Sequence, residues 1–517
     1  MIRYEIVYVQ RVTYEDVSAS GAGQLNPGKS DPGRLLLDDV RGELFVGGAW
    51  VPASGNATFP VHDPATGRVL TEVADATPED GMRALDAAVA AQKSWARTSP
   101  RMRSDLLRRT FELVQAHADD LALLMTLEMG KPLKEARGEV AYGGDFLRWF
   151  SEEAVRIDGR YTPAPNGAGQ MIVSHRPVGP AFLITPWNFP LAMATRKIAP
   201  ALAAGCTVVI KPAALTPLTT IYLAQLLQQA GVPDGVVNVI TTTHSGRVSG
   251  PVIADPRLRK LSFTGSTEVG VRLLEQAAGS VLRTSMELGG NAPFLVFADA
   301  DLDAAVEGAL AAKFRNIGQA CTAANRFYVE ESVADEFARR LTERVSAFRV
   351  GPGTDDGVDI GPLIDQDAID KINSLVGDAV DRGAQLLTGG SPIDGPGTFF
   401  APTVLSGVTS DSDVLAQEIF GPVLAITTFR TEEEAITQAN ATPYGLVGYA
   451  YTADAKRGQR LIEEIDTGMM GLNVGVVSNA AAPFGGVKQS GLGREGGHEG
   501  IHEYLETKYT LTPDPFS

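Results

Sequence analysis

Residues 178–211 read VGPAFLITPWNFPLAMATRKIAPALAAGCTVVIK. Two short apolar runs, AFLIT at 181–185 and TVVIK at 207–211, flank an alanine-rich segment at 191–204 that ends before a glycine. Apolar runs of this length are typical of buried strands, and the segment between them is long enough for a helix. The stretch therefore predicts a strand–helix–strand unit whose two strands lie parallel in one sheet.

The same alternation continues towards the carboxyl end. A helix is predicted at 219–230, a strand at 236–240, and another strand at 260–265, followed by a helix that begins near Thr267. Apolar strands that alternate with helices predict an α/β fold with a doubly wound, Rossmann-like parallel sheet. Later strands and helices predict a second α/β lobe at about 288–480.

Composition excludes several classes of protein. The 517 residues carry 45 Lys and Arg against 62 Asp and Glu, a formal net charge of −17. A surface this acidic repels phosphate backbones, so no nucleic-acid partner is expected. No signal peptide or bilayer-spanning apolar run is visible, so we expect a cytoplasmic protein without a membrane partner. Residues 1–41 are predicted to be a flexible extension, because 18–33 is rich in Gly, Ser, Asn, Asp and Pro.

Cys321 is one of only two cysteines and lies among small polar residues, in FRNIGQACTAANR at 314–326. A thiolate can attack a carbonyl carbon and so begin covalent catalysis. The other cysteine, Cys206, lies among small and β-branched residues and is predicted to be a buried core residue. Two cysteines cannot build a disulfide framework or a structural zinc site.

Three further segments, and the end of one strand, carry side chains that could serve such a thiol. ITPWNFP offers Asn188, an amide donor suited to an oxyanion, and MELGGN offers Glu287, a candidate general base for thioester hydrolysis. EIFGPV offers Glu418, which could bind a ribose diol, and Lys211 ends a strand at the sheet edge where nucleotides bind. Taken singly, each of these residues could equally be a turn residue or a surface charge.

Two motifs near the carboxyl end point to other functions. Gly491–Gly496 spells the dinucleotide fingerprint GxGxxG, but no βαβ unit follows it, so we predict only a glycine-rich loop. His498–His502 spells the zinc motif HExxH, although Gly500 weakens a helix there and no later His or Cys could supply a third ligand. A zinc metallopeptidase that uses His498 and His502 therefore stays open as an off-class alternative.

The four segments around Asn188, Glu287, Cys321 and Glu418 together resemble the aldehyde dehydrogenase superfamily, and the match runs over most of the chain. The resemblance implies that Cys321 is the nucleophile, Glu287 the general base and Asn188 the oxyanion donor, without a metal. It also implies a cofactor site lined by Trp187, Asn188, Lys211, Pro212, Ala213, Ala214, Gly265, Ser266, Leu288 and Glu418. A binding protein that keeps this fold without turnover stays open as well.

The residue at position 214 bears on the choice of cofactor. Family members that prefer NAD usually carry Glu after Lys–Pro–Ala, where it would bind the 2′-hydroxyl of NAD and repel the 2′-phosphate of NADP. This chain has Ala214 there, and Lys211 remains as a nearby cation. We therefore expect NADP to be favoured, with NAD use left open.

Three residues suggest the substrate class. The resemblance is closest to the family members that oxidise succinate semialdehyde to succinate, in which residues at the places of Arg196, Arg315 and Ser478 hold the substrate carboxylate. Two guanidiniums and a hydroxyl suit that role, although one arginine could instead form a salt bridge. The segment before PFGG lacks an acidic residue often seen there, so glutarate or 2-oxoglutarate semialdehyde stays open. Ala323 stands where related members carry a second cysteine, so no disulfide switch is predicted.

The resemblance also implies three lobes and a homo-oligomer. A cofactor-binding domain is predicted at 42–158 and 178–287, and a catalytic domain at 288–480. Residues 159–177 and 481–517 would form a small bridging β-sheet. That sheet would build a homodimer or homotetramer.

Overall fold

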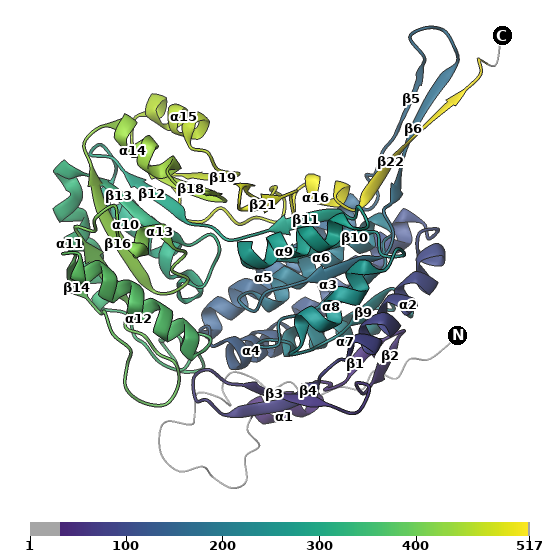
Figure 1. Ribbon diagram of the computed structural model, residues 1–517, viewed down its shortest axis with the longest axis horizontal. Helices are drawn as coiled ribbons and strands as arrows, with labels where there is room; N and C mark the ends of the chain where they lie inside the picture. Colours follow the sequence, from purple (N-terminus) through teal and green to yellow (C-terminus); the bar gives the residue numbers. More distant parts are fainter. Residues whose placement is uncertain (1–31, 515–517) are drawn as a thin grey trace.

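The computed structural model describes residues 32–514, which form two α/β lobes and a small sheet that stands out from them (Figure 1). The strands are β1 (Leu44–Val46), β2 (Ala49–Val51), β3 (Thr58–His62), β4 (Val69–Ala74), β5 (Arg160–Pro163), β6 (Gln170–Pro177), β7 (Ala181–Ile184), β8 (Val208–Lys211), β9 (Val237–Val239), β10 (Lys260–Thr264), β11 (Arg283–Glu287), β12 (Ala292–Val296), β13 (Ala324–Glu330), β14 (Gln385–Thr388), β15 (Thr403–Ser406), β16 (Val423–Phe429), β17 (Tyr444–Gly445), β18 (Val447–Tyr451), β19 (Met469–Leu472), β20 (Val487–Lys488), β21 (Gly491–Leu492) and β22 (Leu505–Thr512). The α-helices are α1 (Pro32–Asp39), α2 (Pro78–Trp95), α3 (Pro100–Ala116), α4 (Ala118–Met129), α5 (Leu133–Glu153), α6 (Pro190–Ala204), α7 (Leu218–Gln229), α8 (Ser245–Ala254), α9 (Thr267–Ala278), α10 (Leu302–Phe314), α11 (Ala334–Ser346), α12 (Gln366–Asp381), α13 (Asp413–Ala416), α14 (Glu432–Asn440), α15 (Ala455–Glu464) and α16 (Glu499–His502).

The first lobe is built on a sheet with the strand order β2-β1-β9-β8-β7-β10-β11-β21. Strands β9, β8, β7, β10 and β11 are parallel, and the chain turns from one side of β7 to the other on reaching β10. Ligands of doubly wound sheets bind beyond the carboxyl ends of the strands at such a switch point. Trp187 and Asn188 follow β7, and Gly265 and Ser266 follow β10, so all four lie at this edge. The predicted α/β fold with a Rossmann-like sheet is confirmed.

Helix α6 shows why the opening stretch folds as predicted. Every one of its residues is buried, which its alanine-rich sequence permits because small side chains let neighbouring elements approach closely. The helix begins at Pro190, whose fixed backbone suits a first helical turn. It ends at Gly205, which has the left-handed φ of 95° that glycine adopts easily. Its position fixes the loop between β7 and α6 that carries Asn188.

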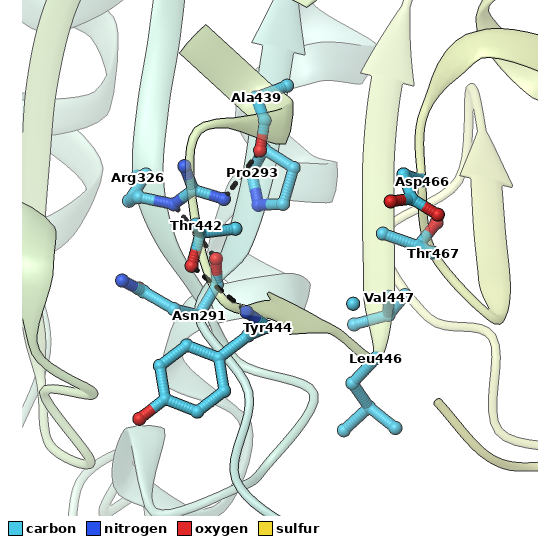
Figure 2. A pocket seen from close by; sticks show the side chains of 11 residues that line it. Asn291, Pro293, Arg326, Ala439, Thr442, Tyr444, Leu446, Val447, Asp466 and Thr467 are labelled. Atoms are coloured by element: carbon cyan, nitrogen blue, oxygen red, sulfur yellow. Dashed lines mark hydrogen bonds between the residues drawn. The ribbon is translucent and has the colours of Figure 1, made fainter. Parts of the chain in front are cut away.

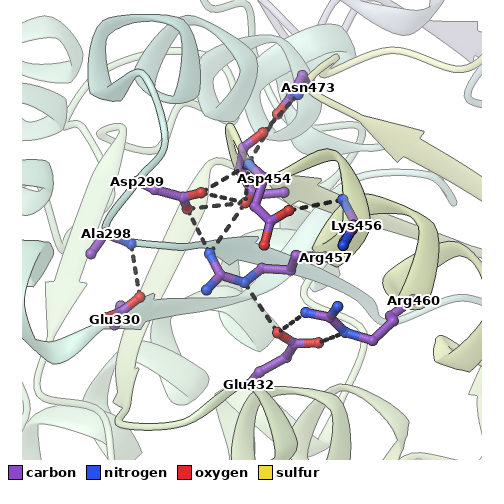
Figure 3. Close-up of polar contacts among 10 residues, drawn as sticks. Ala298, Asp299, Glu330, Glu432, Asp454, Lys456, Arg457, Arg460 and Asn473 are labelled. Atoms are coloured by element: carbon purple, nitrogen blue, oxygen red, sulfur yellow. Dashed lines mark hydrogen bonds and ion pairs between the residues drawn. The ribbon is translucent and has the colours of Figure 1, made fainter.

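The second lobe contains the sheet β14-β15-β16-β13-β12-β18-β19, parallel except for β14. A polar cluster ties its helices to the end of β12 (Figure 3). Arg457 of α15 donates to Asp299 at 2.7 Å and to Glu432 at 3.1 Å, and Arg460 donates to Glu432 at 2.6 Å. Because Glu432 begins α14, these bonds hold α14 and α15 together beside the sheet.

A three-stranded antiparallel sheet projects from the first lobe (Figure 1). Strands β5 and β6 form its hairpin, and β22 pairs with the whole length of β6, from Leu505 opposite Pro177 to Thr512 opposite Gln170. In the described part of the predicted 481–517 bridging segment, which ends at residue 514, β22 is the only strand that joins this sheet. Within the same segment, β21 instead pairs with the end of β11 and extends the sheet of the first lobe, which corrects that part of the prediction.

The amino-terminal prediction is also corrected in part. Residues 32–39 form α1, which packs against α4 through the buried Leu36. The backbone N–H of Arg41 donates to Gln225 Oε1 at 3.1 Å. Burial of Leu36 stabilises an ordered helix here, where the composition had predicted a flexible segment. Residues 1–31 lie outside the described residues. Within 32–514, no helix is long and apolar enough to cross a membrane.

Candidate active site

Cys321 follows a turn with unusual backbone geometry. Asn316 and Ile317 have φ values of 56° and 63°, and Gly318 continues in the same region at 75°. Left-handed backbone costs a non-glycine residue about 1–2 kcal/mol, and such strain persists mainly where function requires it. The turn places Cys321 in a partly exposed position between α10 and β13.

Four charged residues influence the pKa of the Cys321 thiol. Burial raises the pKa of the Cys321 thiol to about 12, Arg196 and Arg315 lower that pKa, and Glu418 and Glu287 raise it. The predicted nucleophile, base and substrate-binding arginines therefore share one site. The thiol is protonated at neutral pH in this state, so its reaction requires a base or a local gain of positive charge.

Asn188 lies beside the loop that carries Cys321. Its side-chain Nδ2 donates to the backbone oxygen of Gln319 at 2.9 Å, and its own backbone oxygen accepts from Lys131 Nζ at 2.8 Å and Asn316 Nδ2 at 3.0 Å. The amide nitrogen uses one hydrogen for Gln319 and keeps a second, as an oxyanion donor must.

Glu287 ends β11 and is 2% exposed. Both of its carboxylate oxygens lack a hydrogen-bond partner among the described residues. Burial, and secondly the charge of Glu495, raise the pKa of Glu287 well above its ordinary value. A buried carboxyl without partners is costly, and such groups are typical of catalytic acids and bases.

Glu495 is a functional candidate that the sequence did not reveal. Its two carboxylate oxygens each pair at 2.5 Å, one with Arg196 Nε and the other with Lys197 Nζ. Burial raises the pKa of Glu495, but Lys197 and Arg196 together hold it below its ordinary value. Glu495 lies in the loop that spells GxGxxG, and the only local signal was an acidic residue among glycines.

The expected carboxylate clamp is assembled in part. Arg315 Nη1 donates to Ser478 Oγ at 3.3 Å, and the guanidinium lies 5.2 Å from the centre of the Phe189 ring. Arg196 is only 1% exposed and forms the salt bridge with Glu495 that the sequence left open. Its Nη1 has no hydrogen-bond partner among the described residues, so one donor remains for an anion.

The expected cofactor residues lie along the edge of the first sheet. Lys211 Nζ donates to Ser245 Oγ at 3.1 Å, and burial lowers the pKa of Lys211 to about 8. Ser266 caps α9 by accepting from the Val269 N–H at 3.4 Å. A side chain at Gly265 would collide with the Phe263 ring at 2.4 Å, so glycine is required there. Ser245 was not foreseen, because a lone serine before a helix carries no distinctive signal.

Glu418 reaches this edge from the second lobe. Its Oε1 accepts from the Gly290 N–H at 3.3 Å, and burial raises its pKa to about 7. The Trp187 ring meets the Phe420 ring edge-on at 5.4 Å, and Leu288 packs on α9 at Gly270. The amino-terminal amides of α9, next to Gly265, suit the pyrophosphate of a dinucleotide. The second carboxylate oxygen of Glu418 suits the ribose hydroxyls.

The loop after Glu287 is fixed by a buried arginine beside a cavity of about 10 Å³ (Figure 2). Arg326 donates to the backbone oxygens of Asn291, Gln438 and Ala439 at 2.9, 3.0 and 2.9 Å. Its donors are used within the protein, so this arginine is structural. The cavity has room for little more than one water molecule and is not a substrate site.

The two carboxyl-terminal motifs have structural roles. Gly491 pairs with Glu287 at the sheet edge, where a side chain would meet the Met286 oxygen at 1.8 Å. His498 Nδ1 contacts Glu153 at 2.8 Å, and its Nε2 contacts His502 Nε2 at 3.1 Å. Helix α16 has four residues, and no group of three or more metal-ligating side chains was found in 32–514.

Comparison with known proteins agrees with this arrangement. Residues 50–510 match the aldehyde dehydrogenase family. A succinate-semialdehyde dehydrogenase of Paenarthrobacter nicotinovorans is 61% identical over 87% of this chain and 100% of its own, and a glutarate-semialdehyde dehydrogenase of Pseudomonas aeruginosa is 48% identical over 91% and 97%. A solved structure described as an E. coli NADP dependent enzyme is 47% identical, with a TM-score of 0.91 over 92% of this chain and 98% of its own. The chain therefore belongs to the aldehyde dehydrogenase family.

Proposed function

We propose that this chain oxidises succinate semialdehyde to succinate with NAD(P)⁺. The observation that carries the proposal is that Arg196, Arg315 and Glu287 all act on the charge of Cys321, while Arg196 Nη1 and both Glu287 oxygens have no hydrogen-bond partner within residues 32–514. Unpartnered buried polar atoms are typical of sites that a ligand or water completes. The printed name of the Paenarthrobacter relative supports the same substrate.

The residues account for each covalent step. The Cys321 thiol first gives its proton to water, and Arg196 and Arg315 stabilise the thiolate that remains. The thiolate sulfur bonds to the aldehyde carbon, and the resulting oxyanion accepts hydrogen bonds from Asn188 Nδ2 and the Cys321 N–H. Bound NAD(P)⁺ would supply the oxidising power, by accepting hydride from that carbon. Glu287 then takes a proton from water as the water attacks the thioester, which releases succinate and the Cys321 sulfur.

Several finer assignments belong to the same proposal. NADP is favoured over NAD, because Ala214 has no carboxylate to repel a 2′-phosphate and Lys211 with Ser245 offers donors to it. Residues 42–158 and 178–287 form the cofactor domain and 288–480 the catalytic domain. The projecting sheet of β5, β6 and β22 would join subunits of a homodimer or homotetramer. We place the enzyme in the cytoplasm.

The deciding experiment compares aldehydes with the purified protein. Formation of reduced nicotinamide would be followed with succinate, glutarate and 2-oxoglutarate semialdehydes and with butanal, each with NADP⁺ and with NAD⁺. The highest kcat/KM is expected for succinate semialdehyde with NADP⁺. A higher value for glutarate semialdehyde would favour the alternative substrate, and cofactor binding without turnover of any aldehyde would overturn the proposal.

Arg315→Leu is expected to raise KM for succinate semialdehyde about 10-fold or more, because a charged hydrogen bond to the substrate carboxylate is lost. KM for butanal, which has no carboxylate, should change less than about 2-fold on the same argument. Steady-state kinetics with both aldehydes checks this. Ser478→Ala removes the hydroxyl partner of Arg315 but keeps the charge, so a smaller rise in KM for succinate semialdehyde is expected from it. An equal rise for both aldehydes would contradict a carboxylate-binding role.

Ala214→Glu is expected to weaken NADP⁺ binding at least about 10-fold relative to NAD⁺, because a carboxylate would repel the 2′-phosphate. Isothermal titration with each cofactor measures the ratio. Ala214→Gln, which has nearly the same size without the charge, separates repulsion from crowding. An unchanged ratio in the Glu variant would place the 2′-phosphate elsewhere.

A further inference from the structure

Three charged side chains from one short segment contact the loops of the active site, with Lys131 and Glu139 buried and Glu135 half-buried. Lys131 is 0% exposed, Glu139 is 3% exposed, and burial raises the pKa of Glu135 to about 7. Glu135 and Glu139 are one turn apart on α5 and therefore lie on the same side of that helix. Charges buried as deeply as Lys131 and Glu139 rarely add net stability, so a role beyond stability is considered for them.

Lys131 and Glu139 fix the loop that carries Asn188. Lys131 Nζ donates to the Asn188 backbone oxygen at 2.8 Å and also to Glu139 Oε2. The other Glu139 oxygen accepts from the backbone N–H groups of Leu191 and Ala192 at 2.9 and 3.1 Å, at the start of α6. The loop is thus held by its own carbonyl and by the helix that follows it.

Glu135 fixes the loop that carries Cys321. Its Oε2 accepts from the backbone N–H of Asn316 at 2.7 Å, the residue that begins the strained turn. The Asn316 side chain then donates to the backbone oxygens of Asn188 and Gln319, both at 3.0 Å. Asn188 Nδ2 also donates to the Gln319 oxygen, so these bonds close a network between the two loops.

The network determines where the Asn188 amide points. The Asn188 backbone oxygen has two donors, and its side-chain nitrogen has one fixed acceptor, so the remaining N–H has a single direction. Oxyanion donors contribute most when they are held in place before the reaction. Misplacement of a catalytic group by about 1 Å can cost roughly 100-fold in rate.

We propose that Lys131, Glu135 and Glu139 are positioning residues that hold the Asn188 amide against the Cys321 loop for oxyanion binding. The inference rests on the proposed function, because it concerns the same reaction. It assigns these residues no contact with substrate or cofactor. Lys131 and Glu139 act through the Asn188 loop, so their effect should disappear when the Asn188 side chain is removed, whereas Glu135 also fixes the Cys321 loop directly.

A double-mutant cycle tests this dependence. Lys131→Met is expected to lower kcat about 10- to 100-fold, with the Kd for NADP⁺ changed less than about 2-fold. In an Asn188→Ala background, the same substitution should lower kcat by less than about 3-fold further. Glu139→Gln, which keeps an oxygen for the α6 N–H groups but loses the charge, provides a milder second cycle if Lys131→Met does not fold.

Lys260→Met is the matched control. Lys260 is also a fully buried lysine, and its Nζ donates to Ser285 Oγ at 2.6 Å at the opposite end of β10 and β11. Its replacement should lower the melting temperature but leave kcat within about 3-fold. Equal kcat losses from Lys131→Met with and without Asn188 would overturn the inference. A wild-type protein without turnover would instead refute the proposed function.

Discussion

Replacing Cys321 with serine is expected to lower kcat for succinate semialdehyde by at least about 1,000-fold, because removal of a covalent nucleophile costs this much or more. A serine hydroxyl in the same place is a far weaker nucleophile, and it has no dedicated base to activate it. Binding of NADP⁺, measured by titration, should change little, since Cys321 donates no side-chain bond to the cofactor edge. The loss should therefore lie in chemistry and not in binding.

Cys206→Ser is the control for that experiment. Cys206 is fully buried in the core of the first lobe, and burial raises its pKa to about 11. Its replacement should change stability and leave kcat within about 2-fold. Iodoacetamide should inactivate the wild type by alkylating Cys321 alone, as peptide mapping would reveal. Residual turnover of Cys321→Ser near the wild-type level would refute the covalent mechanism.

The sequence was sufficient for features that depend on local patterns. The apolar runs at 181–185 and 207–211 became β7 and β8, because short β-branched and apolar segments between helices have few other ways to bury themselves. The residues that follow those strands were thereby placed at one edge of the sheet. Lys211 could be assigned to the nucleotide-binding edge for this reason, whereas Asn188 was assigned from its amide chemistry and Gly265 from the family resemblance.

The parts that could not be predicted depend on contacts between distant segments. Glu495 pairs with Arg196 and Lys197 across about 300 residues of sequence, and no periodicity or motif specifies that pairing. The consequence was largest for Arg196, which looked free to bind a substrate carboxylate. The sequence does not show which carboxylate an arginine pairs with, because that pairing depends on how distant segments pack in the fold.

The same limit hid the segment 131–139. Glu135 and Glu139 read as the polar face at the start of a helix, which normally lies in solvent, and Lys131 lies in the turn just before that helix. The structure buries that face against the loops of Asn188 and Cys321. From sequence alone, a charged helix face could be exposed to solvent or could hold neighbouring loops. The structure distinguishes these two roles because it shows which loops the face contacts.

Glu287→Gln is expected to lower kcat about 100- to 10,000-fold by blocking hydrolysis of the thioester, because glutamine cannot accept the proton from water. In the proposed mechanism the Cys321 thiol gives its proton to water beside Arg196 and Arg315, so formation of that thioester does not need the Glu287 base. Rapid mixing with substrate and NADP⁺ should therefore give a burst of one reduced nicotinamide per active site. Mass spectrometry of the quenched protein should find one succinyl group on Cys321.

The pH dependence of turnover supplies an independent check. Burial and Glu495 raise the pKa of Glu287, so the wild-type base is lost by protonation as pH falls through that raised value. Wild-type kcat should fall with it, whereas the small residual kcat of Glu287→Gln should lack this acidic limb. Asn188→Ala provides the contrast, since it should slow formation of the thioester as well and suppress the burst. A Glu287→Gln variant without a burst, or with the wild-type acidic limb intact, would show that another group activates the water.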